Sequence, residues 1–192
     1  MKINAQNTTP ENKKNALKLH IAPLVDGTYG FQYERMLTKN FSASLSLFGK
    51  ISSTKLLQES ETTKGLGYQL EGRLYPINYA NISPKGMYVG IYNLGYEESY
   101  KITTTQFSSD PATGSYNSKR SESGILIGWT WLIKQALTID VGAAAFYYAN
   151  DKPSTYSIVD SKGTIVNTVF KSDWGFEEGL SGKFRFSLGY AF

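Results

Sequence analysis

The last fifteen residues of the chain, Glu178–Phe192 (EGLSGKFRFSLGYAF), constrain its fold more than any other stretch. From Leu180 to Phe192, even positions hold mostly large apolar residues and odd positions hold mostly polar or small ones. This period of two is typical of a β-strand whose two faces meet different surroundings. A strand that ends on the aromatic Phe192 favours a membrane barrel, in which the final strand closes the wall and places aromatics at the interface.

Seven earlier segments alternate in the same way, so the sequence predicts eight strands. Most are near the length of about 9–11 residues that crosses a bilayer at a tilt, and the number is even. We therefore expect an all-β fold, an eight-stranded antiparallel up-and-down transmembrane β-barrel over residues 15–192, preceded by a flexible periplasmic lead-in over residues 1–14. The seven segments are Asn15–Leu24, Thr28–Leu37, Phe41–Ile51, Gly65–Pro76, Gly86–Tyr100, Arg120–Leu132 and Leu137–Ala149.

Three polar segments separate these strands and predict the orientation. Ser52–Lys64 carries no pattern and is expected to be irregular, Lys101–Lys119 is expected to be a loop into which strands project, and Asn150–Trp174 a long loop with a hairpin over Ser157–Phe170. The connections after the second, fourth and sixth strands are shorter. Outer-membrane barrels have short periplasmic turns and long external loops, so both termini are predicted to lie in the periplasm.

The composition excludes several other classes of protein. The aromatic share is 14%, with 14 Tyr and 18 Gly, which suits β structure better than a helical bundle. There is no Cys, so disulfide scaffolds and Cys-ligated metal sites are excluded. The net charge of +4 is not gathered in one run, so no nucleic-acid partner is expected. No stretch approaches the roughly 18 apolar residues of a transmembrane helix.

The polar face of the predicted strands carries Gly, Ser and a balanced set of charges. A narrow eight-stranded lumen has room for small residues and a few paired charges, so this face is expected to point inward. Glu34 and Glu71 are the expected partners of Arg73 and Arg185. The alternative is a lipocalin-like soluble barrel with the apolar face inside. The candidate lumen charge network is Glu34, Glu71, Arg73, Glu122, Asp140, Lys183 and Arg185, with Lys18 on the same face.

Six short stretches resemble the small outer-membrane β-barrels of Bacteroidetes-type bacteria, of the DUF3575 kind, and their OmpA/OmpX-like relatives. The stretches are NALKL (15–19), QYERML (32–37), EGRLYP (71–76), KGMYVG (85–90), GILIGWTW (124–131) and LGYAF (188–192). The resemblance implies delivery by the secretion system and insertion by the barrel-assembly machinery, which reads the C-terminal strand. The implied assembly signal is Phe184, Phe186, Leu188, Tyr190 and Phe192. The family brings no established activity.

The sequence offers no catalytic set. Its one histidine, His20, lies on the lumen side of the first strand, whereas lipid A deacylase chemistry needs a His with a Ser on the lipid side. We expect no enzyme activity, no metal and no cofactor. The expected role is structural or interactive in the bacterial outer membrane, as an accessory subunit of a larger envelope complex. The partners would be outer-membrane lipid, the barrel-assembly machinery and other envelope proteins. The alternative is a small transport or lipid-handling barrel.

Overall fold

The computed structural model describes residues 13–21, 27–55, 59–76, 83–105, 111–134, 136–153, 155–170 and 176–192. Within these ranges the chain forms ten antiparallel strands. They are β1 (Asn15–His20), β2 (Thr28–Met36), β3 (Phe41–Lys55), β4 (Glu59–Leu74), β5 (Gly86–Thr104), β6 (Ala112–Ile133), β7 (Leu137–Asp151), β8 (Thr155–Val159), β9 (Ile165–Phe170) and β10 (Phe176–Ala191).

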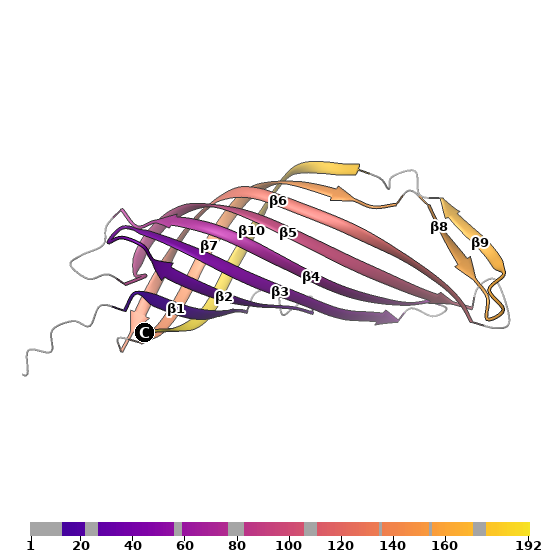
Figure 1. Ribbon diagram of the computed structural model, residues 1–192, viewed down its shortest axis with the longest axis horizontal. Helices are drawn as coiled ribbons and strands as arrows, with labels where there is room; N and C mark the ends of the chain where they lie inside the picture. The colour runs from indigo at the N-terminus through magenta and orange to yellow at the C-terminus, as the bar shows by residue number, and fades with distance from the viewer. Residues whose placement is uncertain are drawn as a thin grey trace, which may run out of the picture.

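Eight of the ten strands close a ring. Each of β1 to β6 pairs with the next strand in sequence, β7 pairs with β10, and β10 returns to β1. β8 and β9 form a separate hairpin that meets β6 at Thr113 and Gly114. Figure 1 shows the ring as a tilted barrel with this hairpin beyond one end. The prediction of an eight-stranded up-and-down barrel, with a hairpin within the last long loop, is confirmed.

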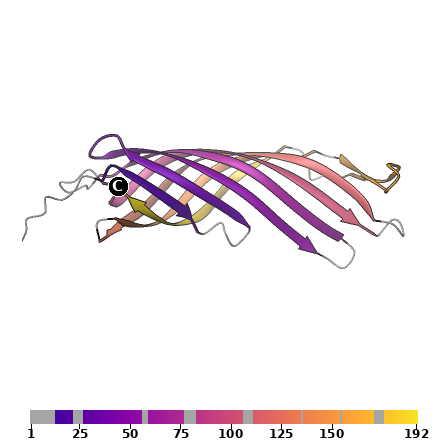
Figure 2. The same cartoon turned by 60° about the horizontal axis from the view of Figure 1, so that its bottom comes forward.

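The first and last strands of the barrel, β1 and β10, bring Asn15 and Phe192 together at one end of the barrel, which we call the terminal end. The amide nitrogen of Asn15 donates to the Phe192 carbonyl oxygen over 3.0 Å, and the Phe192 amide donates to the Asn15 carbonyl over 2.8 Å. The opposite end, called the distal end, is where β3 to β6 reach furthest, as the turned view in Figure 2 shows.

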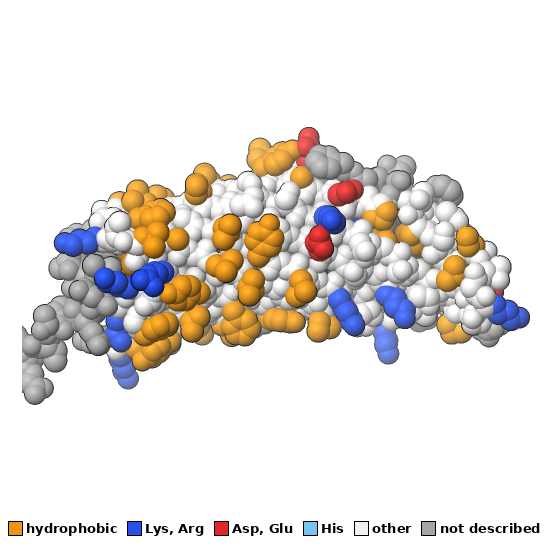
Figure 3. Space-filling model, viewed as in Figure 1, with side chains coloured by type: hydrophobic (Ala, Val, Ile, Leu, Met, Phe, Trp, Pro, Cys, Tyr) orange, Lys and Arg blue, Asp and Glu red, His pale blue; other side chains and the backbone are white. Residues whose placement is uncertain are grey.

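The apolar face of the strands points outward. Large residues such as Leu66, Ile91 and Phe184 are 74%, 68% and 86% exposed, whereas Gln32, Glu34 and Arg73 inside the ring are at most 1% exposed. In Figure 3, hydrophobic side chains gather over the terminal half and the middle of the outer wall. Lys and Arg side chains stand at the terminal edge, and charged side chains of both signs appear toward the distal end. The lipocalin-like alternative is therefore wrong. No helix in the described ranges is long and apolar enough to cross a membrane.

The prediction that the polar segment Ser52–Lys64 is an irregular connection is wrong. β3 continues to Lys55 and β4 begins at Glu59, so strand pairing covers most of the segment. In the predicted loop Lys101–Lys119, β5 likewise reaches Thr104 and β6 already begins at Ala112. The predicted first strand, Asn15–Leu24, is longer than β1, which ends at His20; residues 22–24 lie outside the described ranges.

The parts of β3 to β6 that carry polar residues on both faces form what we call the distal extension, residues 52–55, 59–65, 95–104 and 112–123. Tyr100 stacks on Tyr116 with ring centroids 4.6 Å apart, and Tyr116 contacts Tyr156 of β8 at 5.3 Å. The Tyr100 hydroxyl donates to Glu98, and burial together with this hydrogen bond raises the pKa of that hydroxyl. The aromatic stack thus holds the β8–β9 hairpin against the extension.

The boundary between the apolar wall and the distal extension can be tested by labelling, since the chain has no Cys. Ser115 and Ile127 both point outward from β6, one in the extension and one in the apolar wall. In lipid vesicles, Ser115→Cys should react rapidly with a membrane-impermeant maleimide, and Ile127→Cys should react only after the protein is unfolded. Equal rates for the two variants would show that the apolar wall is not covered by lipid.

Candidate functional site

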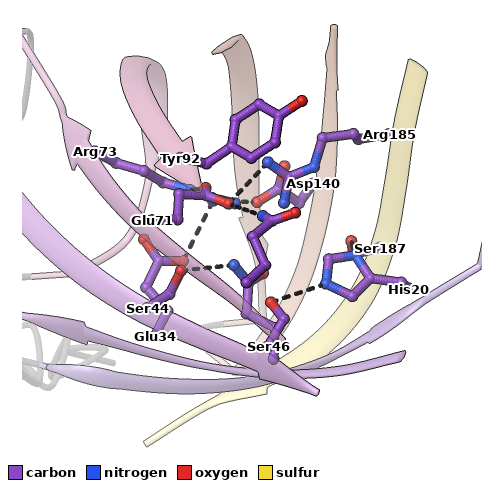
Figure 4. A network of polar contacts seen from close by, with 12 residues as sticks. His20, Glu34, Ser44, Ser46, Glu71, Arg73, Tyr92, Asp140, Arg185 and Ser187 are labelled. Atoms are coloured by element: carbon purple, nitrogen blue, oxygen red, sulfur yellow. Dashed lines mark hydrogen bonds and ion pairs between the residues drawn. The ribbon is translucent and has the colours of Figure 1, made fainter. Parts of the chain in front are cut away.

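Six charged side chains from five strands meet inside the ring, and together we call them the lumen cluster. The cluster holds three acids and three bases, all buried. Figure 4 shows most of its members converging from opposite walls of the barrel. They are Lys18 of β1, Glu34 of β2, Glu71 and Arg73 of β4, Asp140 of β7 and Arg185 of β10.

Two basic groups share the acids at the centre of the cluster. Lys18 Nζ lies 2.6 Å from Glu34 Oε2 and 2.6 Å from Asp140 Oδ2. Arg73 Nη1 also contacts both of these carboxylates, at 3.3 Å for Glu34 and 2.5 Å for Asp140, while its Nε pairs with Glu71. A buried charge is tolerated when it is paired and hydrogen-bonded, and each of these charges is.

The cluster crosses the lumen from wall to wall. Arg185 Nη1 lies 2.8 Å from Glu71 Oε2, although β10 and β4 stand on opposite sides of the eight-membered ring. Arg73 on β4 similarly reaches Asp140 on β7. An eight-stranded ring is only wide enough for its own side chains, so the cluster fills the lumen at this level. The structure thus brings Arg73 together with Glu34, and Arg185 together with Glu71.

Neutral donors complete the hydrogen bonding of the buried acids. Tyr75 donates to Glu34 Oε1 over 2.8 Å, and Tyr88 donates to Asp140 Oδ1 over 2.6 Å. A side chain at Gly128 would overlap the Tyr88 hydroxyl, so the glycine makes room for this tyrosine. Sequence reasoning did not assign either tyrosine to the site. The signal was available: Tyr75 has the parity of Glu71 and Arg73, and Tyr88 lies on the opposite face of β5 from Val89 and Ile91, which point outward.

Two predicted members, Glu122 and Lys183, do not join the lumen cluster. They form a second group toward the distal end, in which Glu122 accepts from Lys183 Nζ at 2.5 Å and from Arg120 Nη2 at 2.8 Å. Lys183 also lies over the rings of Tyr92 and Phe146, at 4.8 and 4.9 Å from their centroids. Sequence reasoning missed Arg120, although it lies two positions before Glu122 and therefore on the same face of β6.

His20 is held between two serines inside the ring. Its Nε2 lies 3.3 Å from Ser46 Oγ and its Nδ1 lies 3.0 Å from Ser187 Oγ. The ring also stacks on Phe48 at 5.2 Å. Both ring nitrogens therefore have partners on β3 and β10, as expected for a histidine that contributes to packing.

The residues of the proposed assembly signal lie where the alternation places them. Their side chains all point outward from the barrel wall, and Tyr190 and Phe192 stand by the terminal end. They are Phe184, Phe186, Leu188, Tyr190 and Phe192. Within the described ranges, no group of three or more His, Cys, Asp or Glu side chains could hold a metal ion.

Comparisons with known proteins support the fold. The structure is similar to the translocator domain of the autotransporter NalP from Neisseria meningitidis, with a TM-score of 0.55 and 15% identity over 91% of this chain. The chain spans 60% of that domain's length. Acinetobacter baumannii CarO aligns over 95% of this chain and 98% of its own, with a TM-score of 0.46 and 11% identity. Acinetobacter baumannii CarO2 aligns over 93% of this chain and 97% of its own, with a TM-score of 0.45 and 9% identity. No family model and no curated protein matches the sequence. The fold is that of a bacterial outer-membrane β-barrel.

The lumen cluster predicts a large stability effect for its central residue. Arg73→Ala would leave Glu34, Glu71 and Asp140 with fewer partners, and breaking a buried ion pair from one side costs about 3–5 kcal/mol. The variant should therefore unfold at a lower temperature in detergent, as measured by the loss of β-sheet circular dichroism. The matched control is Lys119→Ala, which breaks an exposed pair with Glu97 and should change little. Equal unfolding temperatures for the two variants would contradict a stabilising role for the cluster.

Proposed function

We propose that the protein is an outer-membrane anchor with a structural and interaction role, rather than a pore. The observation that carries the proposal is the lumen cluster, in which Arg185 and Arg73 reach acids on the opposite wall. Ions crossing the lumen would have to displace these buried pairs. Separating these ion pairs would leave unpaired buried charges, which costs free energy.

The proposed orientation places both termini in the periplasm and the distal end outside the cell. The connections at the terminal end between β2 and β3 and between β6 and β7 are short, and the longest strands extend in the other direction. Short turns on the periplasmic side are the usual arrangement in outer-membrane barrels. The C-terminal strand, with its outward row from Phe184 to Phe192, would be the segment read by the barrel-assembly machinery. The resemblance to DUF3575-type barrels of Bacteroidetes remains part of this proposal.

The distal extension is the proposed contact surface for another envelope protein. Its strands present Ser, Thr, Asn and Tyr on both faces, and surface segments placed by a rigid scaffold commonly carry binding functions. The proposed role is that of an accessory subunit in a larger envelope complex. We propose no enzymatic role and no cofactor.

The anchor proposal predicts that the barrel does not conduct. In planar bilayers, the wild-type protein should give no steady channels, because the side chains of the lumen cluster block the lumen. Replacing Glu71, Arg73 and Arg185 together by Ser shortens three side chains that cross the lumen, and this variant should give small channels. Both proteins must first show the faster migration of a folded barrel on an unheated detergent gel. Steady wild-type channels would overturn the anchor proposal and favour the transport alternative.

The accessory-subunit proposal predicts a stable complex. After extraction of native outer membranes with a gentle detergent and affinity isolation, mass spectrometry should find another envelope protein at a fixed ratio. A variant in which the β8–β9 hairpin is replaced by a short Gly-Ser linker should lose that protein while keeping the gel mobility of a folded barrel. Isolation of the wild-type barrel alone would contradict the role as a subunit.

A further inference from the structure

An apolar groove crosses the outer wall of the barrel over β4 to β7. Its volume is about 790 Å³, within the range of small-molecule sites. Four of its lining residues stand opposite one another on successive strands, and these strands are paired without a break: Gly72, Ile91, Ile125 and Ala145. The groove is therefore a hollow in a continuous wall, and it faces the membrane.

Side chains of unequal size shape the groove. Phe41 of β3 bounds one end, where its ring lies 3.4 Å from the position that a β-carbon at Gly72 would take. Ala143 leaves the wall low over β7, whereas Ile127, opposite it on β6, is 53% exposed. The hydrocarbon that surrounds this wall consists of lipid chains, so an acyl chain is the ligand available to fill the groove.

Aromatic and basic residues follow the groove toward the terminal end. Trp129 and Trp131 of β6 point outward, each 46% exposed, with ring centroids 6.3 Å apart. Tryptophan is enriched where the hydrocarbon meets the lipid headgroups. Lys134 follows in the turn to β7, and Lys85 directly precedes β5, the strand paired with β6. Two exposed lysines therefore lie on the terminal side of the tryptophans.

The outer surface of the terminal end carries basic but no acidic side chains among the described residues. Lys85 and Lys134 are exposed, whereas the acids of this half of the barrel belong to the lumen cluster and are buried. The connecting residues 77–82 and 135 also hold no acid. Figure 3 shows Lys and Arg, and no Asp or Glu, at the visible terminal edge. This positive charge favours an anionic headgroup.

The distance from the lysines to the groove matches one leaflet of a bilayer. Seven positions along the chain separate Ile127 from Lys134, and at about 3.3 Å per residue they span about 23 Å along the strand. At a strand tilt of about 40°, about 18 Å of this lies along the membrane normal, close to the roughly 15 Å of hydrocarbon in one leaflet. A lipid with its head by Lys134 would thus bring its chain to the groove.

We propose that this part of the wall binds one anionic phospholipid of the phosphatidylglycerol class. Its phosphate would lie between Lys85 and Lys134 and accept hydrogen bonds from their ammonium groups. Its glycerol would lie by Trp131, and one acyl chain would fill the groove beside Ala143. The site does not depend on a closed lumen or on an envelope partner, because the residues that would hold the lipid stand on the outer wall.

Quenching of tryptophan fluorescence by a brominated lipid tests the proposal. A Trp174→Phe background restricts the emission to Trp129 and Trp131. In an uncharged detergent, phosphatidylglycerol with brominated acyl chains should quench this emission saturably, at a concentration on the order of tenfold lower than brominated phosphatidylcholine, because two lysines attract its charge. Equal quenching by the two lipids, or quenching that rises without saturation, would overturn the proposal. Competition by soluble glycerol phosphate would show a site for a water-soluble anion and would also overturn it.

Charge variants locate the headgroup. Lys85→Gln combined with Lys134→Gln should weaken quenching by phosphatidylglycerol on the order of tenfold, to the level of phosphatidylcholine. The matched control, Arg35→Gln, removes an exposed charge from β2, which stands opposite β6 in the ring, and should bind as the wild type does. Unchanged binding by the lysine variant would contradict the site. An equal loss in Arg35→Gln would show general attraction by the terminal end and would contradict it too.

A further variant tests the groove itself. Ala143→Leu combined with Ala145→Leu fills the hollow over β7 with apolar side chains, which suit a wall that faces lipid. Binding of brominated phosphatidylglycerol should weaken several-fold, while the variant migrates as a folded barrel on an unheated detergent gel. Binding equal to that of the wild type would show that the head alone holds the lipid, and the groove would not be its site.

Discussion

The structure depends on one constraint, which is that backbone groups surrounded by hydrocarbon must find their hydrogen-bond partners within the protein. Pairing of β1 with β10 meets this requirement by turning an open sheet into a ring. Closure then creates a narrow interior that excludes bulk water from the polar face of the strands. Polar side chains there must satisfy one another. The balance of three acids and three bases in the lumen cluster is a consequence of that confinement.

The lumen cluster also favours one arrangement of the strands over others. Side chains on a strand alternate between two faces, so a shift of one residue in the register of β4 would turn Glu71 and Arg73 toward lipid. The same shift would remove the partners of Asp140 and Arg185 on other strands. We interpret the buried ion pairs as a device that specifies register, in addition to their effect on stability.

The sequence was sufficient to predict the ring and which face of each strand points outward. Apolar and polar residues alternate wherever one face of a strand meets lipid and the other faces the lumen. Glu71 and Arg73 could be placed inside on that ground alone. Predicting their contacts across the lumen with Arg185 and Asp140 would require the diameter of the ring and the register of its strands, and a local sequence pattern contains neither. Strand pairing in Ser52–Lys64 was missed for the opposite reason: both faces of the distal extension meet water, so alternation disappears there.

The junction of β1 with β10 has a consequence for how the barrel forms. It joins residues near the two ends of the barrel sequence, such as Leu19 and Leu188, whereas β2 to β7 pair with their neighbours along the chain. Contacts between distant residues carry the largest loop-closure entropy and form late. β1 is also the shortest strand of the ring. The last junction to form is therefore the smallest, and an assembling chain would pass through an open sheet whose two free edges are β1 and β10.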